Sequence, residues 1–413
     1  MDVSEPENLG FCHQRLNRIE PKLKAYIDNG DIVGISTLVA RRGQVVHRSL
    51  IGLMDTLANT PITTDAIFRV YSMTKPVICT ALMMLHEEGR FHLDQPISQY
   101  LPQFTNQKVL ITGGNTEKLV PVNREILIKD LFTHTSGLSY TFLADAVAEK
   151  YRTSGLLTDA SVSLADTVQS IANHPLLFHP GERWHYSVSI DVLAHLIEVL
   201  SCCPLGDFLQ DRVFKPLGMD QSGFEVEKAQ ISDIADIFGN IDLLGKDVGF
   251  DELISATTTE PNKLLDLTNT YPYDNPNHAR GGHGLFMTID DYFRFAQMLL
   301  NGGELYGNRV LGRKPVEVMH CNHLPLTLLP FGLNDLVMWT GYGFGLGSRV
   351  CIDPAQTNLT GSVGEFGWAG AAKTYYWVDP REEIIGIFMS QRLSYFQVPE
   401  RDFQALVYQA LVD

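Results

Sequence analysis

Residues 68–76 read Phe-Arg-Val-Tyr-Ser72-Met-Thr-Lys75-Pro, with a serine and a lysine three residues apart at the start of a predicted helix. The apolar side chains that follow repeat with helical spacing, at Ile78, Ala81, Leu82 and Leu85. On one helical turn the side chains at i and i+3 share a face, so Lys75 can reach the Ser72 hydroxyl. A serine hydroxyl needs a nearby base to become a good nucleophile, and a buried lysine can be that base. By itself the motif is weak, because about one Ser-x-x-Lys occurs by chance in a chain of this length.

A tyrosine lies in a similar position further along the chain. Residues 180–187 read Pro-Gly-Glu-Arg-Trp-His-Tyr186-Ser, directly before a second helical repeat at Ile190, Leu193, Ala194 and Ile197. A phenol on such a loop can point into a cleft, although a lone tyrosine there is usually packing material. Beside the Ser-x-x-Lys motif, Tyr186 becomes a candidate for a proton relay shared with Lys75.

Small residues precede a predicted strand near the end of the chain. Residues 364–371 read Gly-Glu-Phe-Gly-Trp-Ala-Gly-Ala. Small residues let backbone N–H groups approach a substrate carbonyl closely, and the same composition also suits a tight turn into a strand. Aromatic residues in and near this stretch suggest an apolar acyl or alcohol pocket: Trp339, Phe366, Trp368 and Tyr375.

Both ends of the chain favour strands. Residues 32–40 and 44–51 predict one hairpin, residues 373–378 and 383–389 predict another, and residues 400–412 predict a closing helix. Strands at both termini around a helix-rich middle predict a sheet closed by the two chain ends, with a helical insertion beside it. An active site between the two parts is the expected consequence.

The domain boundaries follow from this pattern. We expect an α/β sheet domain from residues 1–70 and 275–413, and a helix-rich domain from residues 71–274. Within the latter, residues 224–273 have weak periodicity and predict loops without a clear element.

Charge and composition exclude some classes of partner. The formal net charge of -16 opposes binding to nucleic acid or an anionic membrane surface. The first residues, Met-Asp-Val-Ser-Glu-Pro-Glu, lack the basic start and apolar stretch of a secretory signal, so we expect a cytoplasmic protein. The six cysteines form no regular framework and predict reduced thiols. Gly-x-Ser-x-Gly does not occur, which argues against the nucleophile elbow of an α/β-hydrolase.

The ordered motifs resemble those of the serine β-lactamase and DD-peptidase superfamily, whose motif set includes Ser-x-x-Lys and Lys-Thr-Gly. The likeness is nearest to class C β-lactamases and family VIII carboxylesterases, and it covers most of the chain. Three segments carry it: Ser72-Met-Thr-Lys75, Tyr186-Ser-Val188 at the place of Tyr-x-Asn, and Trp368-Ala-Gly370 at the place of Lys-Thr-Gly. Residues 134–138 and 281–296 are similar to further segments of the group. The resemblance implies a central antiparallel sheet flanked by helices, an inserted helix-rich domain and an active site between them.

Two departures from the β-lactamases favour an esterase. Val188 stands where they have an amide side chain, and Trp368 stands where they have a cationic lysine. Family VIII esterases resemble this chain at both positions. The resemblance therefore implies a serine carboxylesterase acting on small-molecule esters with short acyl groups, with no cofactor and no metal. Alternatives on the same scaffold are a β-lactamase, a D-amino-acid peptidase or amidase, or an acyltransferase, and a non-catalytic acyl-binding module is a further one.

The resemblance also implies roles for individual residues. Ser72 is the expected nucleophile, with Lys75 and Tyr186 as the shared base. The backbone N–H groups of Ser72 and Ala371 are the expected oxyanion hole. The expected substrate-binding residues are Trp368, Ala369 and Gly370. His134 is placed in a structural turn by the resemblance, not in a Ser-His-Asp triad.

Overall fold

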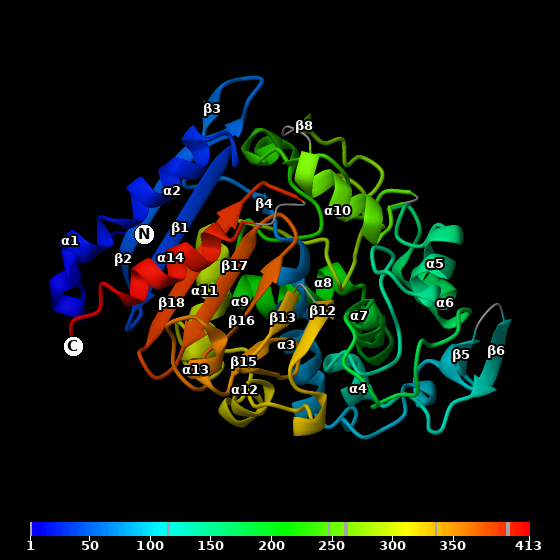
Figure 1. Cartoon of the computed structure of the whole chain (residues 1–413). Helices are drawn as coiled ribbons and strands as arrows, with labels where there is room; N and C mark the ends of the chain where they lie inside the picture. The colour runs from blue at the N-terminus through cyan, green and yellow to red at the C-terminus, as the bar shows by residue number, and fades with distance from the viewer. Residues whose placement is uncertain (1, 114–115, 247, 260–262, 335–336, 394–396) are drawn as a thin grey trace.

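In the computed structural model, both ends of the chain contribute to one eight-stranded antiparallel sheet (Figure 1). The structure describes residues 2–413 apart from 114–115, 247, 260–262, 335–336 and 394–396. The strand order is β14-β15-β16-β17-β18-β1-β2-β3. The bounds are β14 Tyr342–Phe344, β15 Arg349–Cys351, β16 Phe366–Gly370, β17 Thr374–Asp379, β18 Ile384–Ser390, β1 Gly34–Arg41, β2 Gln44–Asp55 and β3 Thr60–Pro61. Both predicted hairpins are confirmed, and the antiparallel β1–β18 pair joins them.

Helices cover both faces of this sheet. On the outer face lie α2 (Ile19–Asp28) and the predicted closing helix α14 (Pro399–Tyr408), in front of the strands in Figure 1, and the short helix α1 (His13–Leu16) contacts α14. On the inner face lies α11 (Ile289–Leu300). Because successive side chains of a strand point to opposite faces of the sheet, neighbouring residues of β17 pack against different helices. Trp377 packs on Phe403 of α14 with ring centroids 5.5 Å apart, and Tyr376 packs on Tyr292 of α11 at 4.9 Å.

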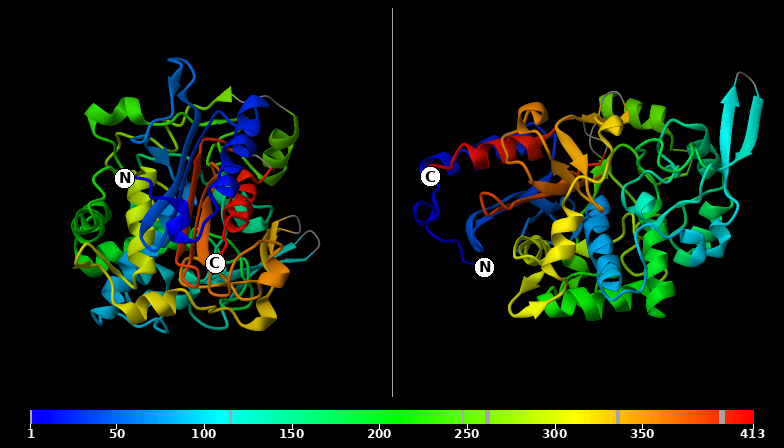
Figure 2. Two further views of the ribbon diagram at one scale, coloured as in Figure 1. Left: turned by 90° about the vertical axis from the view of Figure 1, so that its left-hand side faces the viewer. Right: turned by 90° about the horizontal axis from the view of Figure 1, so that it is seen from below.

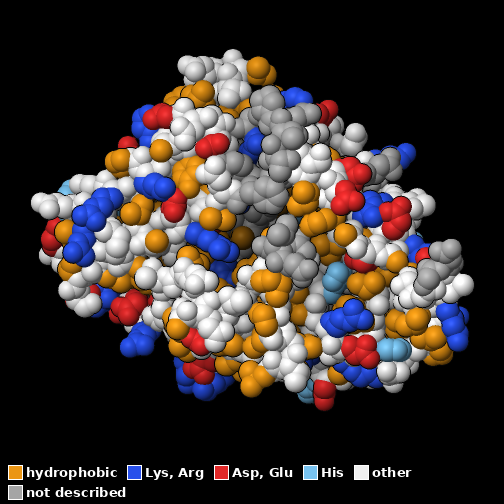
Figure 3. Space-filling view, viewed as in Figure 1, with side chains coloured by type: hydrophobic (Ala, Val, Ile, Leu, Met, Phe, Trp, Pro, Cys, Tyr) orange, Lys and Arg blue, Asp and Glu red, His pale blue; other side chains and the backbone are white. Residues whose placement is uncertain are grey.

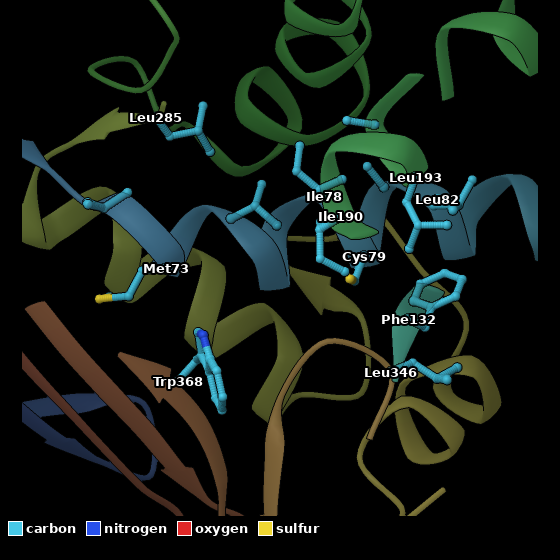
Figure 4. Packing of buried hydrophobic residues seen from close by; sticks show 14 of the residues in the cluster. Met73, Ile78, Cys79, Leu82, Phe132, Ile190, Leu193, Leu285, Leu346 and Trp368 are labelled. Carbon is cyan, nitrogen blue, oxygen red and sulfur yellow. The ribbon is translucent and has the colours of Figure 1, made fainter. Parts of the chain in front are cut away.

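The central helix α3 (Thr74–Glu87) is buried from Thr74 to Leu85 and packs against α7 (Ser189–Ser201). Figure 4 shows Ile78, Cys79 and Leu82 of α3 beside Ile190 and Leu193 of α7. These are the two helices that the apolar spacing predicts. A helix that is apolar on all sides has to be enclosed, and here the sheet lies on one side of α3 and the helix-rich part on the other.

The helix-rich part lies away from α2 and α14, and the β5–β6 ribbon projects from its far end (Figure 2). Its helices are α4 Ile128–Phe132, α5 Ala146–Thr153, α6 Leu164–Ala172, α8 Leu205–Leu209, α9 Lys215–Leu217 and α10 Phe250–Thr259. Two helices, α12 Arg313–Met319 and α13 Pro354–Thr357, lie in the later half of the chain. The described residues also form two-stranded ribbons: β4 Phe68–Arg69 with β9 Phe286–Met287, β5 Lys108–Gly113 with β6 Thr116–Pro121, β7 Phe238–Gly239 with β8 Lys263–Leu264, β10 Glu304–Leu305 with β11 Asn308–Arg309, and β12 Phe331–Asn334 with β13 Val337–Trp339.

One prediction needs correction. Most of residues 224–273 are loops, as expected, but the stretch also contains helix α10 and the short strands β7 and β8, so the expectation of no clear element is wrong. Phe250, Leu253 and Ile254 have helical spacing, but this apolar pattern covers little more than one turn and is too short to predict a helix by itself. Residues 247 and 260–262 of this stretch lie outside the described residues.

Among the described residues, no single helix is both long and apolar enough to cross a membrane. One bent pair of segments, Ser189–Ser201 with Leu205–Leu217, reaches the required length and composition only when both are counted together.

A buried acid stands on the outer side of the sheet. The Glu365 carboxylate accepts hydrogen bonds from Gln404 Nε2 at 2.8 Å and Tyr408 OH at 3.3 Å, and it lies 3.8 Å from Arg349 Nη2. Burial raises the pKa of Glu365 to about 7, although Arg349 acts in the opposite direction. The folded chain therefore holds this proton at a pH where the unfolded chain, with an ordinary glutamate, has lost it.

This difference predicts a pH-dependent stability. Because the folded state binds the extra proton, the free energy of unfolding should fall as the pH rises from about 4.5 to 7, by up to about 3 kcal/mol from this group. We expect Glu365→Gln to flatten the decline of the melting temperature over this pH range. The exposed Glu149 provides a control, since Glu149→Gln should leave the decline as in the native chain. If the melting temperature of Glu365→Gln fell with pH as steeply as that of the native chain, Glu365 would not be the group that binds the extra proton.

Candidate active site

Ser72 lies in the short 3-10 turn η2 (Tyr71–Met73) that leads into α3. Tyr71 in this turn has a φ of 46°, a conformation that side-chain-bearing residues rarely adopt. The surroundings hold the turn in place: Val70 N donates to Leu285 O at 3.1 Å, and Tyr292 OH donates to Met73 O at 3.0 Å. Such unusual backbone persists where the neighbouring structure fixes it, and it is frequent at functional sites.

The structure brings Ser72, Lys75 and Tyr186 together. Lys75 Nζ lies 3.1 Å from Ser72 Oγ, and Tyr186 OH lies 2.8 Å from the same oxygen. Lys75 and Tyr186 are 1% and 5% exposed, while Ser72 is half-buried. A hydroxyl in contact with two proton-carrying groups and with solvent has the geometry required of a nucleophile.

The lysine has three acceptors for its three N–H groups. Besides Ser72 Oγ, Lys75 Nζ donates to Gly282 O at 2.6 Å and to Tyr140 OH at 3.4 Å. The ammonium also lies over the rings of Tyr186 and Tyr140, at 4.6 and 5.2 Å from their centroids. Each N–H group of the lysine therefore has an oxygen within reach, and the end of the side chain lies against two aromatic faces.

Sequence reasoning missed three residues of this environment: Tyr140, Asp191 and Gly282. Asp191 is fully buried in the first turn of α7, and its Oδ1 accepts a hydrogen bond from Gly282 N at 2.9 Å. Burial raises the pKa of Tyr140 well above its usual range, so this phenol stays protonated. Each of the three lies within or close to a segment that the resemblance covers, but only the three-dimensional structure brings them to Lys75.

Strand β16 closes the other side of the site. Trp368 Nε1 donates to Tyr186 OH at 3.4 Å, so the indole contacts the phenol that contacts Ser72. The next side chain, Ala369, is exposed. A Cβ on Gly370 would overlap Val70 O, which explains why a glycine lets the strand approach the Ser72 turn so closely. Ala371 follows the last residue of β16 and is half-buried.

Val188 and His134 both lie behind the site. Val188 is fully buried at the start of α7, and its backbone N–H donates to Ser139 O at 3.1 Å. The His134 ring packs on Tyr186 with centroids 4.8 Å apart, and its Nδ1 lies 3.1 Å from Ser187 Oγ. Burial and the nearby Lys75 charge hold the pKa of His134 well below its usual range, so the imidazole is neutral. These contacts make His134 a support for the Tyr186 ring.

Aromatic side chains extend from Trp368 along one side of the site. Trp339, from the β12–β13 ribbon, stacks on Trp368 with centroids 5.6 Å apart and on Phe331 at 5.4 Å. Figure 3 shows apolar side chains gathered beside a hollow near the middle of the face in view. The suggestion of an apolar pocket fits Trp339 and Trp368, but it is wrong for Tyr375, which packs in the cluster on the outer face of the sheet.

Comparisons with a family model, with curated proteins and with solved structures each find similar proteins over most of the chain. The Beta-lactamase family model matches residues 19–410. An uncharacterized protein of Mycobacterium tuberculosis is 32% identical over 378 residues, covering 90% of this chain and 89% of that protein. Esterase EstB of Burkholderia gladioli is 27% identical over 363 residues, covering 84% of this chain and 83% of EstB. Among solved structures, EstCE1, a hydrolase with promiscuous acyltransferase activity, has a TM-score of 0.77 at 24% identity, covering 97% of this chain and 99% of EstCE1.

Proposed function

This chain belongs to the beta-lactamase family, and on that premise we propose that it is a serine carboxylesterase that hydrolyses short acyl esters. The observation that carries the proposal is the contact of Ser72 Oγ with both Lys75 Nζ and Tyr186 OH. The likeness to EstB, whose name is that of an esterase, supports the choice of reaction.

In the first step, Ser72 Oγ attacks the ester carbonyl and its proton passes to the pair of Lys75 and Tyr186. Lys75 and Tyr186 share one proton between them, and when it resides on Lys75 the Tyr186 oxygen is free to accept the serine proton. Tyr186 is the nearer group, at 2.8 Å, and is therefore the expected direct acceptor. The tetrahedral oxyanion would receive hydrogen bonds from the backbone N–H groups of Ser72 and Ala371.

In the second step, the intermediate collapses, the bond to the alcohol oxygen breaks, and Tyr186 returns the proton to the departing alkoxide. The acyl group is then bound to Ser72 Oγ. A water molecule attacks this acyl-enzyme, gives its proton to the same pair, and releases the carboxylic acid with Ser72 restored. One group thus serves as base and acid in turn.

Trp368 has a place in this scheme. Its indole N–H donates to the Tyr186 oxygen at 3.4 Å, which stabilises negative charge on that oxygen when the phenol has given up its proton. An indole carries no net charge, so Trp368 can support Tyr186 without offering a binding site for a carboxylate.

The choice of esterase over β-lactamase makes a quantitative prediction. A β-lactam antibiotic carries a carboxylate, which cationic and amide groups must hold, but here Trp368 is an indole and Val188 is buried in the core. A lost charge-assisted hydrogen bond costs about 1.5–3 kcal/mol, or about one to two decades in rate. We expect kcat/KM for a short p-nitrophenyl ester to exceed that for nitrocefin by at least about 100-fold.

This experiment also tests the proposed function as a whole. p-Nitrophenyl esters of different acyl length are run beside nitrocefin with one enzyme preparation. Similar efficiencies on the two substrates would favour the lactamase. A burst of one chromophore per chain without steady turnover would instead favour an acyl-binding module.

A further inference from the structure

Asp191 is a buried carboxylate that the mechanism above does not use. It lies in the first turn of α7 with no exposed surface, and its Oδ1 accepts the Gly282 N–H. Within the described part of the chain, Asp191 Oδ2 has no hydrogen-bond partner. Burying a carboxylate oxygen without a hydrogen-bond partner lowers the stability of the folded protein. The charge of Asp191 should therefore have a role beyond its hydrogen bond to Gly282.

Two buried cations flank this carboxylate. Lys75 and Arg280 are each 1% exposed, and both stabilise the charged form of Asp191 against the effect of burial, which raises the pKa of that acid. Among the described residues, the hydrogen bonds of these two cations go to neutral oxygens. Asp191 therefore supplies one negative charge between these two cations, and Asp159 also acts on Arg280.

Gly282 links Asp191 to the lysine. Its N–H donates to Asp191 Oδ1 at 2.9 Å, and its C=O accepts from Lys75 Nζ at 2.6 Å. A Cβ on Gly282 would overlap both Tyr140 OH and Asp191 Oδ2, so only glycine fits between them. The carboxylate thus fixes the backbone that holds the lysine.

We infer that Asp191 is a positioning residue that holds Gly282 against Lys75 and supplies the negative charge that sets the proton affinity of the Lys75–Tyr186 pair. This inference rests on the proposed use of that pair as the base. It assigns to Asp191 no contact with the substrate.

Among the residues that the structure describes, the other titratable groups that face the pair are neutral. Burial raises the pKa values of Tyr140 and Cys79, and it lowers those of His134 and His283, so none of the four carries a charge near pH 7. The charged neighbours in this described part of the chain are Asp191 and, beyond it, Arg280. A change in the charge of Asp191 should appear directly in the pH dependence of the pair.

The sign of the effect does not depend on which member of the pair acts as base. Removing a nearby negative charge makes loss of a proton easier from both an ammonium and a phenol. We expect Asp191→Asn, which keeps an oxygen for the Gly282 N–H, to move the rising limb of the rate against pH about one pH unit lower. A merely structural role would lower the rate at every pH and leave the limb where it is.

The test uses the rate at which a fluorophosphonate probe modifies Ser72, measured against pH. In this reaction the Ser72 Oγ–P bond forms, fluoride leaves, and the serine proton passes to the base. Asp291→Asn is the matched control, because Asp291 is a buried acid of α11 whose carboxylate bonds to Gln221, Ser222 and Arg294 and not to the pair. For Asp291→Asn, we expect the modification rate to rise over the same pH range as in the native chain.

If folded Asp191→Asn showed the same rise of the modification rate with pH as the native chain, the inference would be overturned. If the amide does not fold, Asp191→Ser removes the same charge with a smaller side chain and is held to the same criterion. Because the probe needs no ester turnover, absence of ester hydrolysis with a shifted limb would reject the proposed function and leave the role of Asp191 standing.

Discussion

Ser72→Ala is expected to reduce ester hydrolysis by at least about a thousand-fold while leaving the fold intact, because loss of a nucleophile removes several orders of magnitude. The hydroxyl makes its hydrogen bonds with Lys75 and Tyr186, and Ser72 is only half-buried. Its removal therefore opens little cavity and should change the melting temperature by no more than a few degrees. The measurements are kcat/KM with p-nitrophenyl butyrate and a thermal melting curve.

A serine away from the site provides the matched control. Ser98 hydrogen-bonds to Glu125 at an exposed position, so Ser98→Ala should keep the native rate. If Ser72→Ala retained more than about a hundredth of the native rate, Ser72 would be excluded as the nucleophile, since that loss is too small for this role.

The parts of the site that could be predicted from the sequence are those that local geometry fixes. Ser72 and Lys75 are three residues apart at a helix start, and this spacing alone brings their side chains together. The sheet was predictable for a similar reason, because both hairpins have strand-forming residues around a short turn. Strands at both termini also predicted one sheet closed by the two chain ends, but local spacing does not determine that β1 pairs with β18, hundreds of positions away.

The parts that could not be predicted depend on contacts between distant segments. Tyr140 and Asp191 read as an ordinary aromatic residue and an acid in the first turn of a helix, where acids are common. The burial of Val188 could not be predicted either: the motif shows only that a valine stands in place of an amide side chain, and the structure buries it completely. A motif position fixes where the backbone runs, whereas the direction of a side chain depends on what packs around it.

The relay itself leads to the second large expected effect. Lys75→Met and Tyr186→Phe are each expected to lower kcat/KM for p-nitrophenyl butyrate by about a thousand-fold, since each removes a member of the group that accepts the serine proton. Both substitutions keep the volume of a buried side chain. Phenylalanine also preserves the ring contacts of Tyr186 with His134 and Tyr140.

The double variant decides whether the two residues act as one unit. Lys75 Nζ lies 3.1 Å and Tyr186 OH 2.8 Å from the same oxygen, and the ammonium lies 4.6 Å from the centre of the Tyr186 ring. Groups that share one proton lose their function together, so the double variant should be little worse than either single variant. Independent roles would instead multiply to a loss of about a million-fold. Tyr408→Phe, at a half-buried tyrosine on the outer side of the sheet, should keep the native rate and controls for the loss of a hydrogen-bonded tyrosine hydroxyl. Multiplying losses in the double variant would separate Lys75 from Tyr186 and require a different base for Ser72.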